Sequence, residues 1–152
     1  MSKKPFVTKE KLDEIAAQYA TPFYLYDEAA IRETARRVNK AFAWNQGFKE
    51  YFAVKATPNP AILKILHEEG CGADCSSYTE LLMADAVGFK GDEIMFSSNA
   101  TPAEDFQLAR QLNVTINLDD ITHIDFLEKV ADIPDTVSCR YNPGGHFAIA
   151  NN

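Results

Sequence analysis

Two patterns of apolar residues, one typical of strands and one typical of helices, alternate along most of the chain. Short apolar runs predict β-strands, and stretches with apolar residues three or four apart predict helices between them. The strand candidates are residues 50–56, 72–76, 93–97, 114–118 and 136–141, which start 21 or 22 residues apart. This regular strand–helix alternation predicts an α/β fold with a parallel sheet covered by helices.

Capping residues mark the predicted ends of these helices. Asn59 precedes a proline, the residue favoured at the first helical position. Ser77 and Glu80 have the spacing of a capping box, and residues 101–104 repeat that pattern. Asp120 is expected to cap the last helix. Its predicted inner face is Ile121, Ile124, Leu127 and Val130. Glycines predicted to end two of these helices are Gly70 and Gly88.

The first 26 residues differ from the rest of the chain. Thr8 can cap a helix, and the apolar residues 22–26 that follow it predict a short strand. Asp27 then caps a second amphipathic helix. We therefore expect residues 1–26 to form an N-terminal helix and strand, and residues 27–152 to form the strand–helix domain. The apolar faces predicted for the two helices are Leu12, Ile15, Ala16 and Tyr19, and Ile31, Ala35, Val38 and Phe42.

Two architectures fit five strand–helix units. One is a complete doubly wound sheet, typical of a binding or signalling module. The other is the first part of a (β/α)8 TIM barrel, which takes about 250 residues. The number of strands does not separate them, but a barrel predicts polar residues at the C-terminal ends of its strands.

Composition narrows the class of protein. The 152 residues are 46% hydrophobic and 24% charged, as in a globular domain, and the net charge of −7 argues against a nucleic-acid surface. No long apolar stretch follows Lys3 and Lys4, so we expect neither a signal peptide nor a membrane partner. The cysteines and histidines lack the spacing of a metal site. We expect the cysteines to be free thiols, which indicates the reducing cytoplasm. The cysteines and histidines are Cys71, Cys75, Cys139, His67, His123 and His146.

Polar residues do follow the predicted strands. Lys55 ends the first apolar run, and a desolvated lysine at such a position is a neutral nucleophile of the kind that Schiff-base enzymes use. Arg140 lies among apolar residues of the last predicted strand, where an arginine is expected to bind an anion. The full set at the strand ends is Lys55, Asp74, Ser76, Ser97, Ser98, Asn99, Asn117, Asp119, Arg140 and Asn142.

Each of these residues also has a structural interpretation. The Lys55 amine could extend into solvent from the strand end. Asp74 could bond nearby backbone, and Glu80 fits a capping residue better than a catalytic acid. Asn99 and Asn117 are ordinary turn residues.

Five segments, in order, carry a family resemblance: YFAVKATPNP, GCGADCSSYTEL, IMFSSNA, INLDD and CRYNPGG. They resemble the alanine-racemase-like, fold-type III decarboxylases that depend on pyridoxal 5′-phosphate. Within that group the chain is most similar to the N-terminal portion of the diaminopimelate decarboxylases. Eukaryotic-type ornithine decarboxylases are the next most similar. The resemblance implies a PLP-binding barrel of which about the first five βα units are present.

The resemblance also implies residue roles and a reaction. Lys55 matches the lysine that binds the cofactor covalently, Asp74 matches an aspartate of the cofactor pocket, and Arg140 matches an arginine near the cofactor's phenolic oxygen. The implied reaction is decarboxylation of an amino-acid substrate, foremost meso-2,6-diaminopimelate to L-lysine and CO2 in lysine biosynthesis. Ornithine, arginine or carboxynorspermidine decarboxylation and a non-catalytic five-stranded α/β module stay open.

Several parts of the family pattern cannot be assigned to this chain. They are a histidine that stacks on the cofactor ring, a glycine-rich phosphate cradle, a glutamate at the pyridine nitrogen and a C-terminal β-domain. Residues 22–26 would pair with that domain, and His146 does not replace the stacking histidine. We therefore expect an N-terminal portion of a homodimeric enzyme, inactive by itself.

Overall fold

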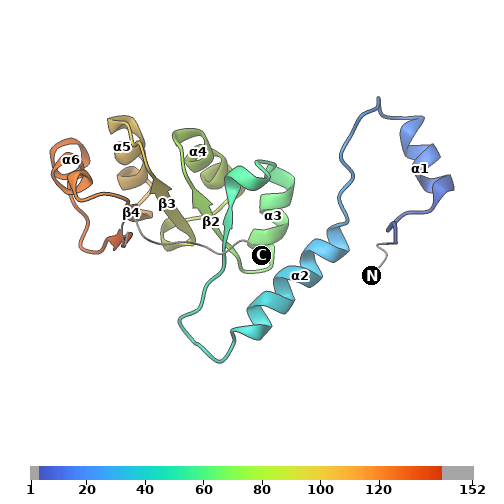
Figure 1. Cartoon of the computed structure of the whole chain (residues 1–152), viewed down its shortest axis with the longest axis horizontal. Helices are drawn as coiled ribbons and strands as arrows, with labels where there is room; N and C mark the ends of the chain where they lie inside the picture. Colours follow the sequence, from blue (N-terminus) through green and yellow to red (C-terminus); the bar gives the residue numbers. More distant parts are fainter. Residues whose placement is uncertain (1–3, 142–152) are drawn as a thin grey trace, which may run out of the picture.

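A five-stranded parallel sheet is the centre of the computed structural model, which describes residues 4–141 (Figure 1). The strands are β1 (Tyr51–Ala53), β2 (Gly72–Cys75), β3 (Ile94–Ser98), β4 (Thr115–Leu118) and β5 (Ser138–Cys139). They lie side by side in chain order, and every neighbouring pair is parallel. All five predicted strands are confirmed, most of them shorter than predicted.

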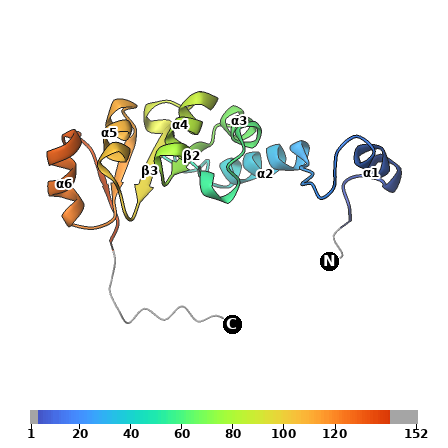
Figure 2. The same ribbon diagram turned by 90° about the horizontal axis from the view of Figure 1, so that it is seen from above.

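Four helices connect these strands and follow one another along one side of the sheet (Figures 1 and 2). They are α3 (Pro60–Glu68), α4 (Tyr78–Val87), α5 (Ala103–Gln111) and α6 (Thr122–Ala131), with short 3-10 turns η1 (Val54–Ala56) and η2 (Gly91–Glu93). A doubly wound sheet reverses its strand order and carries helices on both faces. Sequential order with the helices on one side is the geometry of a (β/α)8 barrel, of which residues 4–141 form five successive strands and the four helices between them.

The face of the sheet under these helices, here the covered face, is apolar. Alternate strand residues point into it, because successive strand side chains face opposite ways. Phe96 of β3 is fully buried there and meets Phe106 of α5 edge to face, with ring centroids 6.2 Å apart. The buried strand residues on this face are Ala73, Cys75, Ile94, Phe96, Ser98, Ile116 and Leu118, and Val54 of η1 is buried with them.

The opposite face, here the open face, is polar toward its C-terminal edge. Paired residues of parallel strands share a face, and the register pairs Asp74 with Met95, Ser97 with Asn117, and Asn117 with Ser138. All five of these side chains are half-buried. In a closed barrel this face is the interior, and its C-terminal end is where active sites are built.

Four of the predicted helix caps are confirmed. The side chains of Thr8, Asp27, Asn59 and Ser77 each accept a hydrogen bond from a backbone N–H in the first turn of the helix that follows. Gly88 ends α4 with a left-handed φ of 120°, and Gly70 follows α3 with a φ of 82°.

Two predicted caps are wrong. The Thr101 hydroxyl donates to the carbonyl oxygen of Ser98 (3.2 Å), and α5 begins only after Pro102 without a side-chain cap. Asp120 lies one residue before the N-cap of α6, and its carboxylate accepts from the backbone N–H of Thr122 (2.9 Å). Ile121 is therefore turned outward and is 80% exposed, so the predicted inner face of this helix is only partly correct.

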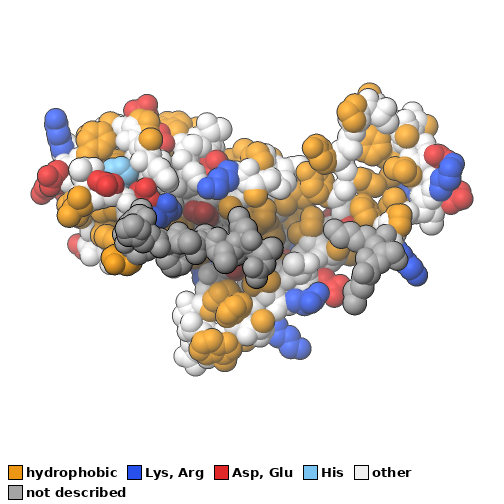
Figure 3. Space-filling view, in the orientation of Figure 1, with side chains coloured by type: hydrophobic (Ala, Val, Ile, Leu, Met, Phe, Trp, Pro, Cys, Tyr) orange, Lys and Arg blue, Asp and Glu red, His pale blue; other side chains and the backbone are white. Residues whose placement is uncertain are grey.

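The N-terminal region, residues 4–41, buries fewer of its side chains than the sheet domain. α2 (Glu28–Ala41) is held against α3 by ion pairs from Arg32 and Arg36 to Glu69, with N···O distances of 2.6–3.0 Å. α1 (Lys9–Ala16) buries none of its residues, and apolar side chains gather on the surface over this region (Figure 3). None of the helices within residues 4–141 is both long and apolar enough to span a bilayer.

Residues 22–26, whose predicted strand is expected to pair with a further β-domain, form no strand within residues 4–141. These residues join no ladder within the described part of the chain, and Tyr24 is 88% exposed. A β-strand needs a neighbouring backbone to satisfy its hydrogen-bonding groups, and none lies beside this segment in residues 4–141.

Candidate active site

The C-terminal edge of the open face brings the predicted site residues together. Asp74 lies in β2, Lys55 follows β1, and Arg140 follows β5. The charges of Lys55, Glu80 and Arg140 all act on Asp74, so the four side chains share one electrostatic environment. The expected gathering of Lys55, Asp74 and Arg140 at one edge is present in the structure.

Lys55 is placed differently from the prediction. β1 ends at Ala53, and Lys55 lies in the 3-10 turn η1, which carries its side chain into solvent. The prediction of a desolvated strand-end lysine is therefore wrong, and the alternative of an exposed amine is correct. An exposed amine at this edge can reach a ligand bound over the sheet.

One carboxylate oxygen of Asp74 is left without a hydrogen bond by residues 4–141. Its Oδ1 atom is buried and has no hydrogen-bond partner within residues 4–141, so it does not bond local backbone as the alternative proposed. Burial raises the pKa of this carboxyl group, while the positive charges of Lys55 and Arg140 act in the opposite direction. Asp74 thus presents a free acceptor that a ligand donor could fill.

Arg140 is held by three contacts. Its backbone N–H donates to the carbonyl oxygen of Leu118 (2.9 Å), its Nη1 pairs with Asp119 Oδ1 (2.5 Å), and its Nη2 donates to Ser97 Oγ (3.0 Å). The anion expected beside Arg140 is therefore partly supplied by Asp119. The arginine side chain is still 46% exposed, which leaves N–H groups available to a ligand.

A chain of hydrogen bonds crosses the open face beside Arg140. The Ser138 hydroxyl donates to Asn117 Oδ1 (2.8 Å), and Asn117 Nδ2 donates to Ser97 Oγ (3.1 Å). Asn117 is thus a residue of strand β4, as the strand predicted at residues 114–118 requires, and the alternative of a turn residue is wrong. Ser138 was not predicted, although it lies only two residues before Arg140, within the segment predicted as the last strand.

Glu80 has a capping role close to the one that its spacing predicts, but its carboxylate bonds the residue before the N-cap and not the N-cap itself. Its Oε2 accepts from the backbone N–H of Ser76 (2.7 Å), while its own N–H donates to Ser77 Oγ (3.4 Å). These two bonds fix the turn that follows β2, and so the strand end that carries Asp74. Asn142, Gly144, Gly145 and His146 lie outside the described residues.

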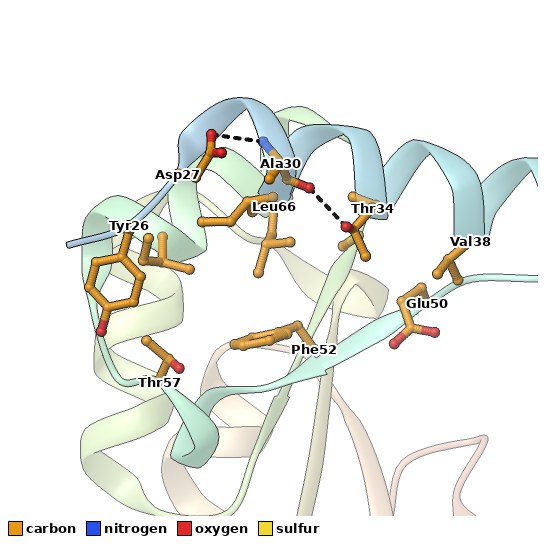
Figure 4. Close-up of a pocket in the computed structure, with 13 residues that line it drawn as sticks. Tyr26, Asp27, Ala30, Thr34, Val38, Glu50, Phe52, Thr57 and Leu66 are labelled. Atoms are coloured by element: carbon orange, nitrogen blue, oxygen red, sulfur yellow. Dashed lines mark hydrogen bonds between the residues drawn. The ribbon is translucent and has the colours of Figure 1, made fainter. Parts of the chain in front are cut away.

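An apolar hollow of about 480 Å3 lies away from these residues (Figure 4). It is formed between α2, α3 and the β1 segment, with Tyr26, Phe52 and Leu66 among its lining side chains. Neither Lys55, Asp74 nor Arg140 lines it. This apolar hollow is therefore separate from the charged strand ends.

The model of one protein family matches residues 28–149, and its description is "Pyridoxal-dependent decarboxylase, pyridoxal binding domain". The chain belongs to this family, whose cofactor is pyridoxal 5′-phosphate. The site fits such a group: Lys55 offers an amine, Arg140 offers donors to anionic oxygens, and the unpaired Asp74 Oδ1 offers an acceptor.

Individual relatives agree with the family. Protein TabA of Pseudomonas amygdali pv. tabaci is 47% identical over 137 residues, covering 90% of this chain and 32% of TabA. Diaminopimelate decarboxylase of Methanothermobacter thermautotrophicus is 37% identical over 131 residues, 86% of this chain and 31% of the enzyme. The structure of Helicobacter pylori diaminopimelate decarboxylase complexed with L-lysine matches with a TM-score of 0.68 and 31% identity, covering 78% of this chain and 30% of that one. The chain spans about a third of the length of the curated relatives it matches.

Proposed function

We propose that the chain carries the cofactor-binding part of an amino-acid decarboxylase that converts meso-2,6-diaminopimelate to L-lysine and CO2. The observation that carries this proposal is the gathering of Lys55, Asp74 and Arg140 at the C-terminal edge of a parallel sheet. The relatives named diaminopimelate decarboxylase support the substrate. Substrates of the same group, such as ornithine, are the alternatives that the assay below separates.

The residues have distinct roles in this proposal. Lys55 supplies the amine that holds the cofactor covalently, and its exposed position lets a substrate amine take its place. Arg140 binds an anionic oxygen and is oriented by Asp119 (2.5 Å). Asp74 accepts a hydrogen bond from the ligand through Oδ1. When bound, the pyridoxal ring supplies an electron-accepting system for the charge left on the α-carbon as CO2 departs.

The remaining expectations are part of the same proposal. The enzyme would act as a homodimer in the cytoplasm, with a small amino acid as its substrate. Residues 1–26 would join a C-terminal β-domain of the kind implied by the resemblance, and residues 27–152 would form part of the barrel.

Cofactor attachment can be tested on the chain itself. We expect borohydride reduction with pyridoxal 5′-phosphate, followed by peptide mapping, to label Lys55. The Lys55→Arg variant should lose this label. Lys64→Arg, at an exposed lysine of α3, should keep it. Labelling spread evenly over the surface lysines would contradict the role of Lys55.

The reaction requires a second measurement. The chain of 152 residues is expected to release no CO2 from meso-2,6-diaminopimelate by itself, since it spans about a third of its relatives. We would express the complete reading frame that encodes the chain and measure CO2 release from meso-2,6-diaminopimelate and L-ornithine in parallel. Faster release from L-ornithine would replace the proposed substrate, and release by the 152-residue chain would contradict its expected inactivity.

A further inference from the structure

The hydroxyl group of Ser97 accepts two hydrogen bonds. One comes from Asn117 Nδ2 (3.1 Å) and the other from Arg140 Nη2 (3.0 Å). Asn117 keeps its amide group turned toward Ser97 because its own Oδ1 takes the proton of the Ser138 hydroxyl (2.8 Å). Asn117 and Arg140 are therefore both donors, and the Ser97 hydroxyl oxygen is the acceptor of both bonds.

A serine hydroxyl has two lone pairs and a single proton. Because both lone pairs of Ser97 are occupied, its proton must point away from Asn117 and Arg140. Within residues 4–141 no hydrogen bond takes up that proton. Ser97 is half-buried on the open face, so the structure holds an oriented donor that only a further group can satisfy.

The position of Ser97 indicates which chemical group accepts the proton of its hydroxyl. Strand β3 is the middle strand of the sheet, with β1 and β2 on one side and β4 and β5 on the other. The end of β3, where Ser97 lies, is therefore between the strand ends that carry Lys55 and Arg140. The donor and the arginine N–H groups are next to each other, an arrangement that suits a negatively charged oxygen.

We propose that Ser97 is a further ligand-binding residue, which donates its hydroxyl proton to an anionic oxygen of the pyridoxal cofactor. This inference rests on the proposed function for the identity of the ligand. The cofactor has two groups with this chemistry, the phenolate of its ring and its phosphate. Ser97 and Arg140 then bind the same part of the ligand, and Asn117 and Ser138 act by keeping the lone pairs of Ser97 occupied.

The test is equilibrium binding of pyridoxal 5′-phosphate to the chain and three variants. Ser97→Ala removes the donor and should weaken binding by on the order of tenfold, as expected for loss of a hydrogen bond to a charged group. Ser97→Thr keeps the hydroxyl and should bind within about twofold of the unchanged chain. Ser98→Ala is the matched control, because Ser98 is the next residue of β3, 7% exposed, and points into the covered face.

Unphosphorylated pyridoxal identifies the oxygen. If Ser97 donates to the ring phenolate, Ser97→Ala weakens the binding of pyridoxal and of pyridoxal 5′-phosphate by the same factor. If it donates to the phosphate, only the binding of pyridoxal 5′-phosphate is weakened. Either result supports the inference.

Two results would overturn it, and they differ. If Ser97→Ala binds pyridoxal 5′-phosphate as tightly as the unchanged chain, this inference is wrong while the proposed function stands. If the unchanged chain shows no saturable binding of pyridoxal 5′-phosphate, both are wrong. Thermal unfolding of each variant verifies that a change in affinity is not a loss of folding.

Discussion

The two faces of the sheet are built from alternate residues of the same strands, yet they have opposite characters. On the covered face Cys75 is fully buried, and burial raises the pKa of its thiol to about 12. Its neighbour Asp74 points to the open face, is half-buried, and keeps an unpaired oxygen. The comparison teaches that one face supplies the stability of the fold while the other can carry unsatisfied polar groups for a ligand.

The same contrast holds along β3. Phe96 packs against α5, whereas Ser97 takes part in a polar chain that ends at Arg140. Unsatisfied polar groups lower stability when they are buried. They are tolerated here because the packing of the covered face holds the strands in place without them.

The largest expected effect is loss of packing on the covered face. Phe96→Ala should reduce the free energy of unfolding by about 3–5 kcal/mol, because it leaves a cavity in the core of the sheet. Met95→Ala, one residue away on the half-buried open face, should cost clearly less. Urea denaturation of both variants measures the difference. Equal losses would show that the open face is packed as tightly as the covered face.

A smaller effect is expected where the open face is closely packed, at its N-terminal end. A Cβ atom added to Gly72 would lie 2.6 Å from the Tyr51 ring and 2.7 Å from the carbonyl oxygen of Glu93. Gly72→Ala should therefore destabilise the chain by about 1–3 kcal/mol. Gly47→Ala is the control, because the nearest atom to its added Cβ is 3.6 Å away. An unchanged denaturation midpoint for Gly72→Ala would contradict this close approach.

The smallest effect is a pH-dependent one at Asp74. Burial raises the pKa of this carboxyl group, so the folded chain binds its proton more tightly than the unfolded chain does. That contribution is complete below the unfolded pKa, near 3.8, and is lost as the pH rises through the folded pKa. Asp74→Asn should therefore have little effect at pH 3 and raise the denaturation midpoint slightly at pH 7.

The matched control for Asp74 is Asp135→Asn, because Asp135 is exposed. It should leave the midpoint unchanged at both pH values. A lower midpoint for Asp74→Asn at pH 7 would mean that the carboxylate is stabilised in the folded chain, and it would contradict the view of Asp74 as an unsatisfied acceptor.

Much of the architecture could be predicted from the sequence. The spacing of apolar runs predicted all five strands, and local hydrogen bonds confirm the caps at Asn59 and Ser77. The prediction was wrong where pairing decides the structure. The apolar run that begins at Tyr51 continues to Ala56, but the ladder with β2 ends at Ala53 and the chain turns.

The candidate site was only partly predictable for the same reason. The sequence placed Lys55, Asp74 and Arg140 at strand ends, and the structure places them in one environment. It did not reveal that Asp119 pairs with Arg140, or that Asn117 bonds to Ser97 and Ser138. Each of these depends on a neighbour from another strand.

The sequence by itself determined the period of the strands, the residues that alternate along them and most helix starts. These features depend on interactions within a few residues of the chain. Only the tertiary structure decided which face the helices cover and which side chains meet on the other. Arg140 and Ser97 are 43 residues apart in sequence, and their hydrogen bond exists only because parallel pairing brings β3, β4 and β5 side by side.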